Sequence, residues 1–220
     1  MKWTSLEKAL LFFSVLTIII VGVVSKSDLL TIICPIVGVI AVLLIAKGQN
    51  LGQVFGTLIA ILYSIVSFQN KYYGEVLIYG LILFPMHIIG IITWINHKSK
   101  KTDFVEINVI KKREWITILT VFPVVFIGIY YLLKYFNTNE LLVSTISVIT
   151  GLFAVYLQIR RSRYSFSFYL INDIILIALW GLPIIHGKYT LLPMLFDPII
   201  NFINDLYGFY NWKKMELLQK

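Results

Sequence analysis

Residues 29–46 read LLTIICPIVGVIAVLLIA, a stretch of 18 residues without a charged side chain. A hydrocarbon core about 30 Å thick is crossed by a helix of about 20 apolar residues, so this stretch is predicted to span a membrane. The whole chain has the same character, with 59% hydrophobic residues, 14% charged residues and a mean hydropathy of +0.85. A water-soluble fold of 220 residues could not bury so much apolar surface.

Seven further apolar runs of similar length are separated by short polar segments, which predicts eight membrane-spanning helices. The first run is interpreted as a retained helix, because no small-residue cleavage signal follows it. The eight runs are Ala9–Val24, Leu29–Ala46, Leu51–Phe68, Val76–Ile95, Trp115–Leu133, Leu141–Gln158, Tyr164–Ile185 and Leu191–Tyr210.

The basic residues are divided unevenly between the two sides that eight crossings create. One side holds 15 of the 19 lysines and arginines, and the other holds only Lys26, Lys71, Lys134 and Lys188. Because basic residues near helix ends stay in the cytoplasm, both termini are predicted to be cytoplasmic, with the chain in the inner membrane of a bacterial cell. The topology accounts for the net charge of +8, so lipid and not nucleic acid is the expected surrounding partner.

Two parts of the sequence resemble each other. Residues 38–47 (GVIAVLLIAK) align with residues 151–160 (GLFAVYLQIR), and Gly90–Trp94 aligns with Gly208–Trp212 as Gly-x-x-x-Trp. Each unit holds three helices, and a single run stands between them, so both units enter the membrane in the same sense. The predicted fold is an all-α integral membrane protein with two parallel three-helix repeats, a linker helix and an extra N-terminal helix. The predicted boundaries are 1–28 for the extra helix, 29–97 for the first repeat, 98–140 for a basic cytoplasmic loop and the linker helix, 141–215 for the second repeat and 216–220 for a cytoplasmic tail.

Three carboxylates fall inside the predicted spans, at Asp173, Asp197 and Asp205. An ionised group at membrane depth costs about 2.5–3.5 kcal/mol on insertion scales, so each carboxylate is a candidate functional group. The Asn-Asp pairs at 172–173 and 204–205 are predicted to meet at one depth near the midplane, whereas Asp197 is expected to cap the outer entrance. His87, which follows Pro85, is interpreted as a structural residue at a kink.

Amides and carboxylates at one depth suit an uncharged or cationic solute with hydroxyl and amide groups, and aromatic side chains would stack on a flat ring. The candidate substrate-binding residues are Asn172, Asp173, Asn204, Asp205, Tyr169, Trp180, Tyr207, Asn201, Phe168 and Gln158. One alternative is that these polar groups only join helices to one another. The alternative from another class is an intramembrane enzyme in which Asp173 and Asp205 do acid–base chemistry.

No motif for a resident cofactor or metal is present in the sequence. It has no phosphate-cradling glycine loop, no His-Glu metal motif and no paired nucleophile and base. The single cysteine, Cys34, excludes an intramolecular disulfide and a cysteine-based zinc cluster. No cofactor is therefore expected.

Three segments resemble the nicotinamide riboside transporter (PnuC) family. They are residues 204–215 (NDLYGFYNWKKM), residues 172–180 (NDIILIALW) and residues 151–160. The family is similar in layout to the SWEET sugar transporters, with three, one and three helices and an occasional extra first helix. The resemblance implies facilitated diffusion of a vitamin nucleoside, trapping of the product by a cytoplasmic kinase, and a homotrimer.

One departure from the family bears on the substrate. Riboside carriers of the family have a Trp-x-x-Trp motif leading into the asparagine of the seventh helix, where this sequence reads SFSFYLIN at residues 165–172. Phe168 and Tyr169 offer one ring each in its place. A deoxynucleoside or another vitamin, such as thiamine or riboflavin, is therefore an alternative substrate.

Overall fold

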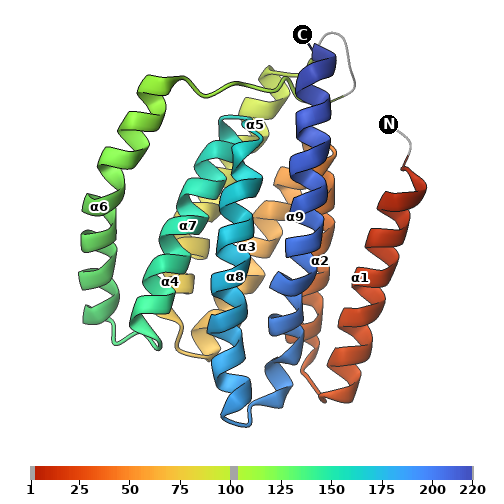
Figure 1. Ribbon diagram of the computed structural model, residues 1–220. Coiled ribbons are helices and arrows are strands. Elements are labelled where there is room, and N and C mark those ends of the chain that lie inside the picture. The colour runs from red at the N-terminus through yellow and green to blue at the C-terminus, as the bar shows by residue number, and fades with distance from the viewer. Residues whose placement is uncertain (1–2, 100–103, 220) are drawn as a thin grey trace.

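The regular structure of the chain is entirely helical in the parts that the computed structural model describes, residues 3–99 and 104–219. The long helices run side by side as a bundle (Figure 1). In chain order the elements are α1 (Ser5–Val24), α2 (Leu29–Ala46), α3 (Leu51–Gln69), α4 (Tyr73–Val76), the π-helix η1 (Leu77–Leu83), α5 (Phe84–Asn96), α6 (Lys112–Tyr135), α7 (Leu141–Ile159), α8 (Tyr164–Ile185), the 3-10 turn η2 (Tyr189–Leu191) and α9 (Leu192–Gln219).

Each predicted apolar run is a helix in the structure, and α4, η1 and α5 follow one another without a break. The ends of the helices differ from the predicted ends by at most four residues, except that α9 continues nine residues beyond Tyr210. Hydropathy misses this extension because residues 211–219 are largely polar, whereas the helix can continue past the membrane surface into water.

Seven helices in the described part of the chain are long and apolar enough to cross a membrane: α1, α2, α3, the segment Tyr73–Asn96, α6, α7 and α8. The last long helix, α9, has 28 residues and is less apolar, because Asp197, Asn201, Asn204 and Asp205 are buried on its inner face. It packs along α8 and α2. The structure therefore confirms a multi-pass membrane protein, and the eighth crossing by α9 stays a prediction.

The core of the bundle is a closed ring of helices. Contacts run from α2 to α3, then to α5, α7, α8 and α9, and from α9 back to α2. Two helices lie outside the ring, α6 against α7 and α1 against α2 and α9, and they stand at opposite edges of the bundle (Figure 1). α1 begins and α9 ends at the same end of the bundle, which we call the basic end because α2 and α7 also end there, at Lys47 and Arg160.

The π-helix η1 interrupts the third helix of the ring. Pro85 lies two residues beyond its end and lacks the N–H that would continue a regular hydrogen-bond ladder. Wider helical turns of this kind often occur at functional sites. Here η1 presents Ile78, Tyr79 and Leu83 to the cavity described next.

Candidate functional site

A cavity lies inside the ring of helices and is lined by every segment of that ring. Its volume is about 100 Å³, which is room for several water molecules at about 10–15 Å³ each. The polar lining consists of Glu75, His87, Ser147, Gln158, Asn172, Asp173, Asp197, Asn201, Asp205 and the hydroxyls of Tyr63, Tyr79 and Tyr169. A ring-bearing solute would require the side chains around it to move apart.

Asp173 on α8 and Asp205 on α9 both line the cavity, and their carboxyl groups lie close enough for a hydrogen bond between them. Both residues are buried, at 6% and 2% exposure. The two aspartates that helical spacing placed at one depth are thus neighbours across α8 and α9, and their depth in the membrane stays a prediction. A carboxylate without a proton is only an acceptor, so a hydrogen bond between the two groups needs a proton on one of them.

Two more carboxyl groups line the same cavity. Asp197 accepts a hydrogen bond from Asn201 Nδ2 at 2.9 Å, so it belongs to the cavity and does not only cap an outer entrance. Glu75 on α4 is fully buried. Neither of its carboxyl oxygens makes a hydrogen bond of normal geometry within the described residues, and the side chain of Ser147 on α7 lies beside it. Glu75 escaped the sequence analysis because the predicted span began one residue later, at Val76.

A chain of hydrogen bonds connects the two halves of the ring beside the cavity. His87 Nδ1 donates to Gln53 Oε1 at 2.9 Å, and Gln158 Nε2 donates to the same oxygen at 3.1 Å. The Tyr169 hydroxyl donates to Gln158 Oε1 at 2.7 Å. His87 thus has a structural partner, as its sequence context predicted, and it also lines the cavity.

Two amide groups in the cavity have free acceptor capacity. The amide nitrogens of Asn172 and Asn201 donate to Ser147 O at 3.4 Å and to Asp197 Oδ1 at 2.9 Å. Their carbonyl oxygens have no partner among the described residues. Together with the carboxyl groups, they make the cavity rich in acceptors, which suits a solute that brings donors or positive charge.

Six of the ten predicted binding residues line the cavity, and the other four lie outside it. Asn204 is adjacent to Asp205 and points about 100° away around the helix. Phe168 packs against Trp115 and Phe153, and the Tyr207 hydroxyl donates to Glu7 Oε1 at 2.7 Å. The six residues in the cavity are Gln158, Tyr169, Asn172, Asp173, Asn201 and Asp205.

Trp180, the fourth residue outside the cavity, helps to close the end of the ring opposite the basic end. Its indole N–H donates to the Tyr63 hydroxyl, and its ring lies edge-on to Tyr63 and Tyr72. The Tyr72 hydroxyl donates to Leu179 O at 3.3 Å. Burial raises the pKa of Tyr72 to about 12, so this hydroxyl keeps its proton and its hydrogen bond at neutral pH.

The basic end of the ring is closed by a reciprocal pair of tryptophans. Trp94 Nε1 donates to Gln158 O on α7 at 3.1 Å, and Trp212 Nε1 donates to Ile45 O on α2 at 2.9 Å. The two rings lie 5.6 Å apart. Ile45 and Gln158 are matched positions in the aligned segments 38–47 and 151–160, so each tryptophan bonds to the same place in the opposite unit.

The glycines of the two Gly-x-x-x-Trp motifs are explained by the same closure. A Cβ at Gly90 would lie 2.6 Å from Gln53 Oε1, and a Cβ at Gly208 would overlap the Phe166 ring. Both glycines allow a side chain of a neighbouring helix to pass close to the backbone. Gln53 and Phe166 also occupy matched positions, because their residue numbers differ by 113, as those of Ile45 and Gln158 do.

We expect Gly208→Ala to destabilise the protein by about 1–3 kcal/mol, because the added methyl group overpacks the contact with Phe166. The matched control is Gly128→Ala on α6, where a Cβ meets no atom within 4 Å. That control is expected to stabilise the helix slightly, since alanine has the higher helix propensity. Thermal unfolding of the two variants in detergent measures the difference, and equal melting temperatures would contradict the close-packing explanation.

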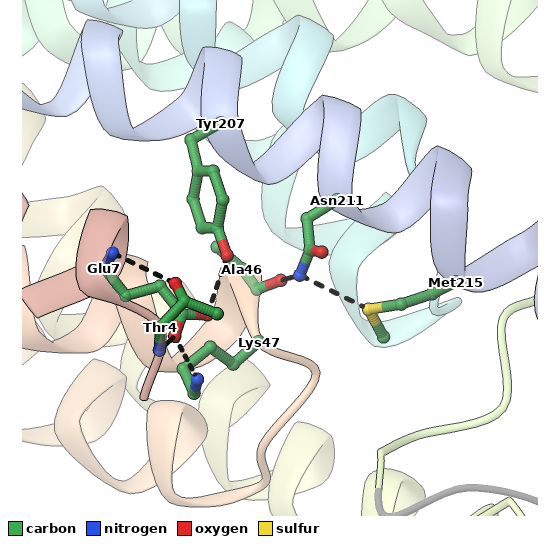
Figure 2. A network of polar contacts seen from close by, with 7 residues as sticks. All are labelled: Thr4, Glu7, Ala46, Lys47, Tyr207, Asn211 and Met215. Atoms are coloured by element: carbon green, nitrogen blue, oxygen red, sulfur yellow. Dashed lines mark hydrogen bonds and ion pairs between the residues drawn. The ribbon is translucent and has the colours of Figure 1, made fainter. Parts of the chain in front are cut away.

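The outer helix α1 is attached to the basic end by a buried polar network (Figure 2). Glu7 accepts from Lys47 Nζ at 2.6 Å and from the Tyr207 hydroxyl at 2.7 Å, and it forms a capping box with Thr4. Lys47 Nζ also lies 4.8 Å from the centre of the Trp3 ring. Asn211 on α9 donates to Ala46 O at 2.8 Å, so α1, α2 and α9 are joined at one point.

Comparison with known proteins gives consistent results over nearly the whole chain. The sequence profile of the nicotinamide mononucleotide transporter family matches residues 28–214. The nicotinamide riboside transporter PnuC of Neisseria mucosa is 25% identical over 218 residues, which are 97% of this chain and 82% of that protein. The protein of the same name from Haemophilus influenzae is 24% identical over 216 residues, which are 97% of this chain and 92% of that protein.

A solved structure has the same fold. The crystal structure of the vitamin B3 transporter PnuC superimposes with a TM-score of 0.89, at 23% identity, over 100% of this chain and 95% of that one. The helical arrangement described above, including the outer helix α1, therefore has a counterpart in an experimental structure. These relatives are transporters and not enzymes.

Proposed function

The chain belongs to the nicotinamide mononucleotide transporter family, and from this premise we propose that it carries a nicotinamide riboside-like vitamin or nucleoside across the membrane. The observation that carries the proposal is the acceptor-rich cavity enclosed by the helical ring, with Asp173 and Asp205 side by side in its wall. Gln158, Tyr169, Asn172 and Asn201 would bind hydroxyl and amide groups of the solute. Trp180 and Tyr63 would close over it, and deoxynucleosides, thiamine and riboflavin remain alternative solutes.

The proposed movement is alternating access by two parallel repeats, at 29–97 and 141–215, in a SWEET-like layout. The reciprocal bonds of Trp94 and Trp212 support this repeat, because matched residues make matched contacts. In the present conformation the basic end and the opposite end are both closed by aromatic residues, so a solute in the cavity would be enclosed. Rocking of one repeat against the other would release one set of contacts at a time.

Further features of the proposal come from the family resemblance. They are facilitated diffusion, trapping of the solute by a cytoplasmic kinase, and a homotrimer. The proposal also places the chain in the bacterial inner membrane with both termini cytoplasmic. The uneven distribution of lysine and arginine between the two ends supports this orientation.

Uptake into proteoliposomes tests the proposal. The solutes to compare are nicotinamide riboside, thiamine, riboflavin and deoxynucleosides. We expect Asp173→Asn and Asp205→Asn each to reduce the uptake of the transported solute by about tenfold, since one good charge-assisted contact is worth about 1.5–3 kcal/mol before compensation by the partner. Glu106→Gln is the matched control, because the Glu106 side chain is 62% exposed outside the cavity. Uptake of every solute by both aspartate variants at the wild-type rate would exclude this cavity as the pathway.

A further inference from the structure

The cavity holds an excess of acidic groups over basic ones. Glu75, Asp173, Asp197 and Asp205 all line it, and His87 is the only lining residue in the described chain with a basic side chain. Each ionised group at this depth costs free energy unless a cation or a hydrogen-bond donor compensates it. The four acidic groups therefore need either bound cations or bound protons.

The contact between Asp173 and Asp205 shows where one proton is held. Two ionised carboxylates cannot hydrogen-bond to each other, because neither has a donor, and like charges in contact are not both ionised. A pair in contact inside this cavity, with no cation beside it among the described residues, therefore holds at least one proton. This is an arrangement that a positively charged solute can change.

The surroundings of the pair contain no fixed positive charge among the described residues. The other titratable groups that line the cavity are Tyr169 on α8, Asp197 on α9, Glu75 on α4, Tyr79 on η1, His87 on α5 and Tyr63 on α3, and Cys34 on α2 lies near Asp197. His87 already donates to Gln53. The other groups are acidic or neutral, so none of them can replace the proton as a counter-charge.

We propose that a positively charged solute enters this cavity in exchange for the proton that Asp173 and Asp205 share. The inference rests on the proposed function and adds the charge of the solute and the fate of a proton. When the cation binds, the shared proton leaves the carboxyl oxygen and is released through water to the solvent outside the cavity, and both carboxylates then face the positive charge. One positive charge replaces another, so the exchange leaves the net charge of the occupied cavity unchanged.

The exchange distinguishes among the candidate solutes. Nicotinamide riboside and thiamine each have a permanently charged ring nitrogen, whereas deoxynucleosides and riboflavin are uncharged. A neutral solute brings no charge to replace the proton, so its binding would leave the carboxyl pair as it is. The structure therefore favours the two cationic solutes.

Calorimetric titration of the full-length protein in detergent tests the exchange. The matched probes are nicotinamide riboside and its reduced 1,4-dihydro form, which differ in the charge of the ring. Titration in two buffers of different ionisation enthalpy gives the number of protons released. We expect about one proton per bound cation, and since protons are a product of binding, affinity should rise about tenfold per pH unit while the pair is protonated. The reduced form should release none.

The variants separate the two aspartates from the rest of the protein. In Asp173→Asn and Asp205→Asn the shared proton has no second carboxylate, so proton release should be lost. The control Glu106→Gln should release protons as the wild type does. Binding of the cation without proton release by the wild type, or equal release with the reduced form, would overturn the inference while leaving the proposed function intact.

Infrared spectroscopy of the solute-free protein tests the shared proton without any solute. The C=O band of a protonated carboxyl group should change in Asp173→Asn and Asp205→Asn and stay unchanged in Glu106→Gln. Absence of such a change overturns the shared proton. If the change is present and none of the candidate solutes binds, the proposed function is wrong and the shared proton stands.

Discussion

Glu7→Gln is expected to destabilise the protein by about 3 kcal/mol, the largest effect on stability that the structure predicts for a single side chain. The substitution leaves the Lys47 ammonium group without its partner, and Lys47 and Glu7 are 0% and 2% exposed. Breaking one partner of a buried ion pair costs about 3–5 kcal/mol. We expect the lower end, because Lys47 keeps its contact with the Trp3 ring and lies at the end of α2. Thermal unfolding in detergent measures the change.

The double variant Glu7→Gln with Lys47→Met should recover most of the lost stability, because it removes the unpaired charge. The ion pair between Glu114 and Arg160 provides a matched comparison, since Arg160 aligns with Lys47. Its side chains are 18% and 43% exposed, so Glu114→Gln should cost less than about 1 kcal/mol. Equal losses from the two glutamine variants would show that burial does not decide the strength of these pairs.

The two ion pairs also relate the outer helices to each other. Lys47 ends α2 and pairs with Glu7 on α1, and Arg160 follows α7 and pairs with Glu114 on α6. The hydrogen bonds that Arg160 donates to Glu114 raise the pKa of the guanidinium group above its usual value, so the pair stays ionised. Each three-helix unit is thus joined at its basic end to the helix that precedes it in the chain. The first helix was predicted as an extra helix and α6 as a linker, whereas these ion pairs place α1 beside α2 and α6 beside α7 in the same way.

The helices themselves were predictable from the sequence because a membrane span has a simple physical requirement. About 20 apolar residues are needed, and runs such as Leu29–Ala46 and Tyr164–Ile185 have the same bounds in the structure. The π-helix at Leu77–Leu83 was not predicted, since hydropathy reports burial and not the hydrogen-bond pattern. Pro85 was the available signal for it.

The site was predicted in part. Asp173 and Asp205 were found because a carboxylate within an apolar run is costly and needs a reason. Helical spacing placed Trp180 on the stripe of Asp173, but the part of that stripe that lines the cavity ends at Leu176, four residues or about 6 Å before Trp180. Spacing within one helix also does not say which helix faces it, and so Phe168 and Tyr207 were assigned to the cavity although they face α6 and α1.

Removing both indole donors at the basic end is expected to have the largest effect on access to the cavity. Trp94→Phe and Trp212→Phe keep an aromatic ring but leave Gln158 O and Ile45 O without their donors. One hydrogen bond contributes about 1 kcal/mol, which corresponds to about a fivefold change in an equilibrium constant. Because the two bonds are reciprocal, each single variant should favour opening of this end about fivefold, and the double variant about 25-fold.

The rate at which a cavity thiol reacts from the basic side measures this opening. Ser147→Cys places a thiol on the cavity wall, and Cys34→Ala removes the buried native thiol. An impermeant thiol reagent reacts in proportion to the population that is open to its side, as long as that population is minor. The control Trp115→Phe changes an indole that stacks on Phe168 away from the closure, so it should leave the rate unchanged. A double variant that reacts no faster than the parent would show that the two tryptophans do not hold this end closed, and unequal single variants would contradict the proposed relation between the two repeats.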